Sequence, residues 1–211
     1  MLEHIQWLGH GSFLVLEPKV IYIDPWKVPS NAFHPDAILI SHDHYDHCST
    51  ADIQRLSGPD TRIVCNERVA SQIEHEATIL RPWQSITLDR VSVKAIPAYS
   101  QNGSLHPLSH GGLGFIISAN YFDIYYAGDT KIIAEMEKIH PDIALLPIDN
   151  NDTLSIADAV EVIRIIRPKW VIPYNWGNSG LIQMKDLHEF KTLVGELAQV
   201  IIPRINERLS N

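Results

Sequence analysis

The chain has 211 residues, of which 45% are hydrophobic and 20% are charged. These values fit one globular domain over residues 1–211 with enough length to bury a core. The formal net charge of −8 argues against the clustered Lys and Arg that phosphate-backbone binding needs. The composition therefore favours a small-molecule substrate over nucleic acid, and it carries no information about oligomeric state.

The chain shows no apolar run of about 18 residues, the length that a transmembrane helix requires. Residues 1–7 also lack a basic start followed by an apolar stretch. We therefore expect a cytoplasmic protein without a membrane span. Cys48 and Cys65 are too few for a disulfide framework, so we expect reduced thiols, although Cys48 is also an alternative soft metal ligand.

The first half of the chain predicts short strands joined by turns. Apolar or alternating runs indicate strands at residues 13–16, 20–23, 37–40, 62–65, 91–95, 113–117 and 122–127. Residues 50–56 are tolerant of helix and are followed by the breaker Ser57-Gly58-Pro59, so a short helix is predicted there.

The second half predicts clearer helices. Ser155 and Asp158 resemble a capping box at the start of an amphipathic helix that Pro168 ends. A second helix is predicted over residues 187–197, with strands at 143–146, 170–172 and 200–202. Strand-rich halves that each carry helices predict an α/β fold of two facing sheets with helices outside, a four-layer αββα sandwich.

The stretch "SHDHYDHCST", which follows the apolar run 37–40, indicates a metal-binding loop. His42 and His44 are two residues apart, so in an extended segment both side chains face one ion. If the chain then turns into helix, Asp46 and His47 come round beside them. Imidazole and carboxylate groups suit zinc and similar divalent ions, so one loop offers up to four ligands.

Ligands from elsewhere must complete such a centre. His106, in a Gly- and His-rich loop, and Asp129, at a strand end in "YYAGDT", are the best candidates by residue type. Either residue alone would be typical of an ordinary turn or an exposed loop. They are candidate ligands only because they occur together with the His-rich loop.

The motifs resemble the metallo-β-lactamase superfamily of metal-dependent hydrolases. The resemblance rests on "HDHYDH" after a strand, preceded by "IDP" and followed by "GDT". The additional motifs "WLGHGSFLV", "PAYS" and "DIALLPI" are similar to a compact branch of uncharacterised metal-dependent hydrolases related to the ascorbate-6-phosphate lactonases. The resemblance runs from about Trp7 to Trp176 and supports the αββα fold.

The resemblance implies a centre for one or two ions, zinc first, with manganese or magnesium as alternatives. The implied ligands are His42 and His44 at a first site, Asp46 and His47 at a second, and Asp129 as the bridging carboxylate. It favours His106 as the third histidine of the first site, with His110 as the rival.

Two other residues of the resembling motifs have less defined roles. Asp24 matches an aspartate that supports the metal loop. His10 in "LGHGS" either reaches the same face or is a hydrogen-bonded structural histidine.

The chain departs from the family pattern at Asn175. After the strand 170–172, the family has Pro-x-His, and that histidine closes the second site, whereas this chain has Pro173-Tyr174-Asn175. An amide oxygen is a poor substitute for imidazole on zinc. Three outcomes fit: a mononuclear centre, an altered second site, or loss of hydrolysis. Asp149 and Asp152 are further candidate carboxylates, although such loops are usually turns.

The functional hypothesis is a hydrolase that uses metal-activated water on a small phosphorylated, lactone or ester metabolite. In this hypothesis Asp46 orients the water or accepts its proton, and His47 acts as a general acid or hydrogen-bond donor. The alternative is a metal-binding sensor or partner-binding protein without turnover on a hydrolase scaffold, an alternative that Asn175 favours.

Overall fold

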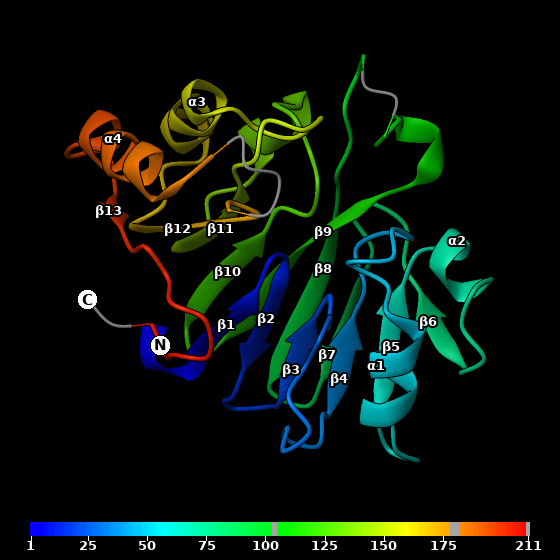
Figure 1. Ribbon diagram of the computed structural model, residues 1–211. Helices are drawn as coiled ribbons and strands as arrows, with labels where there is room; N and C mark the ends of the chain where they lie inside the picture. The colour runs from blue at the N-terminus through cyan, green and yellow to red at the C-terminus, as the bar shows by residue number, and fades with distance from the viewer. Residues whose placement is uncertain (103–104, 178–181, 210–211) are drawn as a thin grey trace.

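The computed structural model describes residues 1–102, 105–177 and 182–209, and its strands form two mixed sheets (Figure 1). The N-terminal sheet has its six strands in sequence order. The first three strands are antiparallel and the remaining pairs are parallel. Its strands are β1 (Ile5–Gly9), β2 (Ser12–Val15), β3 (Ile21–Ile23), β4 (Ala37–Leu39), β5 (Arg62–Cys65) and β6 (Ala77–Ile79).

The second sheet has the order β13-β12-β11-β10-β9-β8-β7. Strands β7 to β10 pair antiparallel, and β10 to β13 pair parallel. Its strands are β7 (Ser85–Leu88), β8 (Val91–Pro97), β9 (Leu113–Ala119), β10 (Phe122–Tyr126), β11 (Ile143–Pro147), β12 (Trp170–Tyr174) and β13 (Gln199–Val200).

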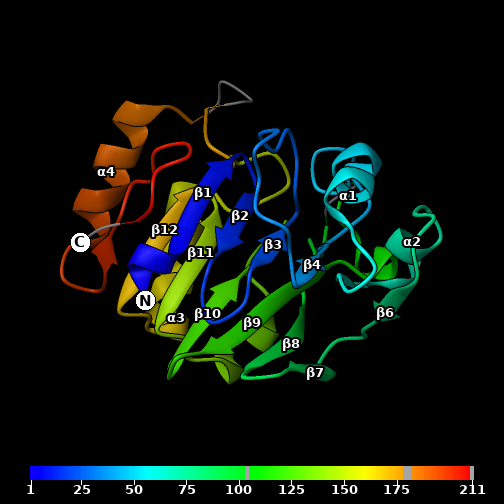
Figure 2. The ribbon, with the colours of Figure 1, turned by 90° about the horizontal axis from the view of Figure 1, so that it is seen from below.

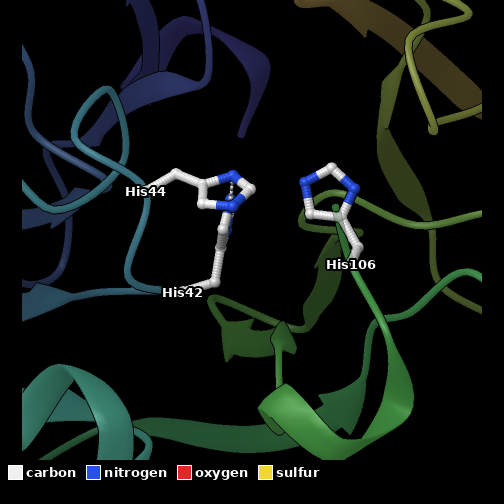
Figure 3. Close-up of side chains that lie close together, drawn as sticks. All are labelled: His42, His44 and His106. Carbon is white, nitrogen blue, oxygen red and sulfur yellow. Dashed lines mark hydrogen bonds between the residues drawn. The ribbon is translucent and has the colours of Figure 1, made fainter. Parts of the chain in front are cut away.

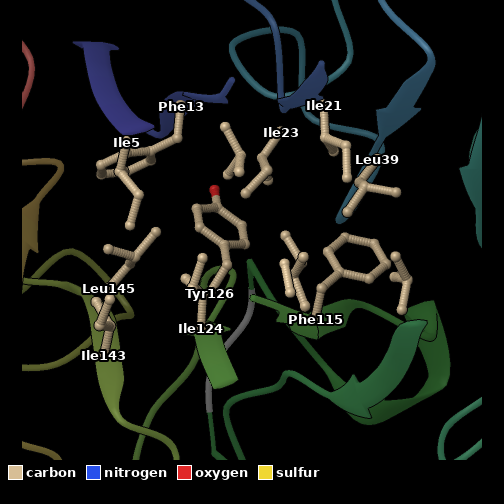
Figure 4. Packing of buried hydrophobic residues seen from close by; sticks show 14 of the residues in the cluster. Ile5, Phe13, Ile21, Ile23, Leu39, Phe115, Ile124, Tyr126, Ile143 and Leu145 are labelled. Atoms are coloured by element: carbon tan, nitrogen blue, oxygen red, sulfur yellow. The ribbon is translucent and has the colours of Figure 1, made fainter. Parts of the chain in front are cut away.

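Three separate hydrophobic clusters define four layers. The largest cluster lies between the sheets, where Ile5, Phe13 and Leu39 from one sheet face Phe115 and Leu145 from the other (Figure 4). A second cluster lies between the C-terminal sheet and helices α3 (Ile156–Ile166) and α4 (Met184–Val194). A third packs α1 (Thr50–Leu56) and α2 (Glu67–Ala70) on the N-terminal sheet. Figure 2 shows the two helix pairs at opposite ends of the molecule. The predicted αββα sandwich is confirmed.

The sequence predicted most elements close to their observed positions. The helix at 50–56 has the predicted bounds, and the predicted Ser155–Asp158 capping box is present. The last helix starts and ends earlier than predicted, at Met184–Val194. It ends there because Gly195, which follows it, takes a positive φ of 53°. The last strand is confined to Gln199–Val200 instead of 200–202.

Three strands and one α-helix of the described residues were not predicted: β1, β6, β7 and α2. The short 3-10 helices at Leu2–His4, Leu108–His110 and Ala134–Lys138 were not predicted either. Strands β6 and β7 lack fully buried residues, and they are only three and four residues long, so even the polar–apolar alternation of β7 is too short to indicate a strand by itself. Among the described residues, no helix combines the length and the apolar character that crossing a bilayer demands.

The packing between the sheets predicts the effect of replacing Phe115, whose side chain is fully buried. Phe115→Ala should lower the free energy of unfolding by about 3–5 kcal/mol, because the cavity it leaves lies between two layers that cannot both relax. Leu193→Ala, at a position 51% exposed on α4, should change it by no more than about 0.5 kcal/mol. Urea denaturation measures both, and equal effects would contradict the assigned core.

Candidate metal centre

The candidate site lies beyond the carboxyl ends of three strands in each sheet, and within each sheet these three strands run in the same direction. In the N-terminal sheet, β1, β3 and β4 point the same way, because β2 is antiparallel to β1 and β3 while β4 is parallel to β3. In the other sheet, β8, β10 and β12 likewise share one direction. The residues that follow these six strands are therefore carried to the edges that form the site; they include His10, Asp24, His42, His106, Asp129 and Asn175.

Three histidines form the first cluster (Figure 3). His42, His44 and His106 each offer a ring nitrogen, and these nitrogens lie within 4.8 Å of one another. His42 Nε2 is 3.1 Å from His44 Nδ1. Asp129 Oδ2 lies 3.4 Å from His106 Nε2 and 3.9 Å from His42 Nε2. Four ligands placed tetrahedrally around zinc are about 3.4 Å apart, so the four groups suit one ion.

Asp46 and His47 form a second cluster with His10. The ligand atoms of His10, Asp46 and His47 also lie within 4.8 Å of one another. His47 Nε2 is 3.5 Å from Asp129 Oδ2, and His10 Nε2 is 2.9 Å from Asp46 Oδ2. The structure thus brings together all six sequence-predicted residues and adds His10, whose role the sequence left open.

Asp24 supports both clusters through its buried carboxylate. Oδ2 accepts hydrogen bonds from His47 Nδ1 and Tyr126 OH, both at 2.7 Å, and from the Ser41 hydroxyl. Because that hydroxyl donates to Asp24, it accepts from His42 Nδ1, 2.9 Å away. Both imidazoles therefore carry their proton on Nδ1 and present Nε2 to the centre. The expectation that Asp24 supports the loop agrees with this geometry.

Burial and neighbouring charges shift the pKa values of the cluster in opposite directions. Burial lowers the pKa of His42 well below its usual value, with a further contribution from His47. Burial alone would lower the pKa of His47, but the carboxylates of Asp129 and Asp24 outweigh it and raise this pKa to about 9. Against its own burial, the histidines hold the pKa of Asp129 far below its usual value. An ion would take over the role of these protons by neutralising Asp129.

The structure separates His106 from its rival His110. Both line the pocket beside the first cluster, but only His106 belongs to the cluster. Asp152 Oδ2 accepts hydrogen bonds from the backbone N–H groups of Leu105 and His106, at 3.0 and 3.1 Å. The carboxylate of Asp152 therefore fixes the loop that carries His106, and it is not in any ligand cluster of the described residues. Asp149 closes its own turn through Asn151 N–H and Thr153 OH.

Asn175 lies at the centre, as the family pattern indicates, but as a hydrogen-bond donor. Its side chain is buried, and Nδ2 donates to Asp129 Oδ1 at 2.8 Å. It therefore orients the carboxylate shared by the two clusters.

Two contacts near the loop were not predicted from the sequence. Asp43 Oδ2 accepts hydrogen bonds from Arg68 and Gln72, and these tie the loop to the α2 region. The second contact is the hydrogen bond from Tyr126, the last residue of β10, to Asp24. The alternation of side chains along β10 turns Tyr126 toward the other sheet, and this alternation was the only sign of the contact in the sequence.

Cys48 and Cys65 are free and buried, and burial raises the pKa of each thiol to about 12. A thiol with so high a pKa is a poor ligand.

The Asp24 contacts predict the effect of Asp24→Asn. The new amide has one acceptor oxygen where several donors converge, so the free energy of unfolding should fall by about 1–3 kcal/mol. Metal affinity should fall by about 10–100-fold, because His42 and His47 lose their common orienting group. Competition with a chromogenic chelator measures the affinity. Tyr126→Phe removes one donor and should reduce affinity less; unchanged affinity in Asp24→Asn would contradict this role.

Comparison with known proteins identifies the family. A family model described as a β-lactamase superfamily domain matches residues 4–175. A UPF0173 metal-dependent hydrolase of Thermococcus kodakarensis is 32% identical over 97% of this chain and 98% of its own length. Another from Thermoplasma acidophilum is 32% identical over 96% of each chain.

Solved structures agree with this assignment. A putative metal-dependent hydrolase from Parabacteroides distasonis superposes with a TM-score of 0.85 at 27% identity, covering 94% of this chain and 91% of that one. Igni18, a metallo hydrolase from Ignicoccus hospitalis, superposes with a TM-score of 0.80 at 26% identity, covering 98% and 96%. The chain therefore belongs to the UPF0173 family of metal-dependent hydrolases, within the metallo-β-lactamase superfamily.

Proposed function

We propose that this hydrolase acts on a small phosphorylated, lactone or ester metabolite, with zinc held by His42, His44, His106 and Asp129. The observation that carries the proposal is a set of buried ring nitrogens with no hydrogen-bond partner of their own. His47 Nε2 and His106 Nε2 are such atoms within the described part of the chain. A buried polar atom without a partner is costly, and a cation on His42, His44 and His106 would satisfy His106 Nε2. His47 Nε2 points to cation binding in the neighbouring cluster. The donor set of imidazole and carboxylate suits zinc, with manganese as the closest alternative.

A divalent ion at this position would polarise a carbonyl or phosphoryl oxygen and lower the pKa of water. Within the chain, Asp46 is the best group to contact that water, because its side chain remains 22% exposed at the edge of the centre. The side chain of His47 is only 1% exposed and faces Asp24 and Asp129. Its surroundings therefore favour ion binding over proton delivery to a substrate.

The rim of the centre supports an anionic or polar metabolite as the substrate. Trp26 packs edge-on against His10, with ring centroids 5.4 Å apart, and against the exposed Tyr45 at 6.2 Å. The ammonium group of Lys27 lies 3.8 Å from the centre of the Trp26 ring. An exposed cation beside aromatic faces suits the phosphate of a small ligand. The motif resemblance to the ascorbate-6-phosphate lactonases supports the same substrate class.

The proposal predicts that hydrolysis depends on the ion. The purified protein, reloaded with Zn²⁺ or with Mn²⁺, is assayed on sugar-phosphate lactones, simple lactones, carboxylic esters and a chromogenic phosphodiester. We expect turnover of at least one substrate, loss of turnover on chelation, and its recovery on adding metal. Tight metal binding without turnover of any substrate would instead support the metal-binding protein without catalysis.

The two pocket histidines provide a matched pair of variants. His106→Ala should lower metal affinity by more than the roughly 10–100-fold typical of an outer residue, because it removes a ligand. His110→Ala should leave affinity within about threefold, since His110 lies outside the cluster. Chelator competition measures both, and the opposite ranking would assign the ligand to His110.

A further inference from the structure

The second cluster of ligands differs from the family pattern in its chain origin. His10 comes from the turn between β1 and β2, while Asp46 and His47 come from the loop after β4. The three ligand atoms lie within 4.8 Å of one another, and His10 Nε2 lies 2.9 Å from Asp46 Oδ2. These separations are those of neighbouring ligands on one divalent cation, for which about 3.4 Å is the tetrahedral value.

The turn that carries His10 is fixed against the centre. The His10 carbonyl accepts hydrogen bonds from Trp7 Nε1 at 2.8 Å and from Asn175 N–H at 3.5 Å. The following residue, Gly11, passes so close to His47 that an added Cβ would lie 2.6 Å from the imidazole Cε1. His10 itself adopts a positive φ of 49°, an uncommon conformation for a residue with a side chain. The backbone is therefore shaped to hold the His10 ring beside His47, with ring centroids 5.2 Å apart.

The contact between Asn175 N–H and the His10 carbonyl places two loops of different sheets side by side. Asn175 uses its amide nitrogen to hold Asp129, and it offers no imidazole. The turn that carries His10 thus lies against the loop that carries Asn175. A histidine on this turn is therefore the candidate source of the nitrogen ligand that Asn175 does not provide.

We propose that His10 takes the place of the family histidine that Asn175 replaces, and that with Asp46 and His47 it completes a site for a second divalent cation. This cation shares the Asp129 carboxylate with the ion on His42, His44 and His106. Imidazole and carboxylate ligands suit Zn²⁺, Mn²⁺ or Fe²⁺ in this site. Asn175 acts as a positioning residue for Asp129. The inference rests on the proposed metal dependence but concerns the number of ions and the source of a ligand.

The test is metal stoichiometry on the full chain after chelation, with Co²⁺ titration followed by calorimetry and visible absorption, and with bound zinc measured by elemental analysis. We expect two equivalents for the native protein. His10→Ala should bind one equivalent, with the affinity of that ion within about threefold of the tighter native step. His110→Ala is the matched control and should retain two.

A double variant tests whether the histidine ligand can be supplied from position 175 instead of position 10. Asn175→His combined with His10→Ala should regain the second equivalent, because the new imidazole arises beside the lost one. If His10→Ala does not fold, as judged by circular dichroism, His10→Asn replaces it and should also bind one equivalent. Two equivalents with native affinities in a folded His10 variant would overturn the proposal, as would one equivalent in the native protein.

The outcome separates this inference from the proposed function, because stoichiometry is measured without substrate. Two ions without turnover would refute the proposed hydrolysis and support the second site. One ion with metal-dependent turnover would refute the second site and support the hydrolysis.

Discussion

The buried carboxylate of Asp24 is the constraint on which the centre depends. It is fully buried, so its free energy is acceptable only because several donors surround it. Those donors come from both sheets: Ser41 and His47 from the loop after β4, and Tyr126 from β10. One carboxylate therefore sets the tautomers of an imidazole in each cluster and at the same time links the two sheets at their shared edge.

Electrostatics explains why the centre is built around Asp129. Its carboxylate faces three imidazoles, His42, His47 and His106, in an enclosed space that favours neither an isolated negative charge nor clustered positive ones. Asp129 contributes to raising the pKa of both His47 and His106, so the surroundings of this carboxylate stabilise positive charge. A cation would take the place of protons on these imidazoles and neutralise Asp129. The imidazoles could then bind the cation in their neutral forms, so the geometry is suited to metal binding.

The sequence predicted the layers and the ligand loop because both are encoded locally. Hydrophobic runs define strands, and the spacing from His42 to His47 lies within a single turn of chain. The proximity of His10 to Asp46, and the bond between Asn175 and Asp129, depend on which strands share a direction in each sheet. Such long-range pairings leave no periodic signal, so the sequence placed Asn175 by resemblance and left His10 between two roles. Asp152 was predicted as a possible ligand, whereas its carboxylate secures the neighbouring loop.

Because six strand ends converge at the centre, a ligand at one position in space can come from any of several loops of the chain. The sheets are held by the core between them, while the loops beyond the strands contribute little to that core. A histidine can thus be lost from one loop and gained on its neighbour without altering the scaffold. In evolution, such a centre can exchange ligands between loops while its shape persists. Homologous centres are then better compared by the coordinates of their donor atoms than by aligned letters.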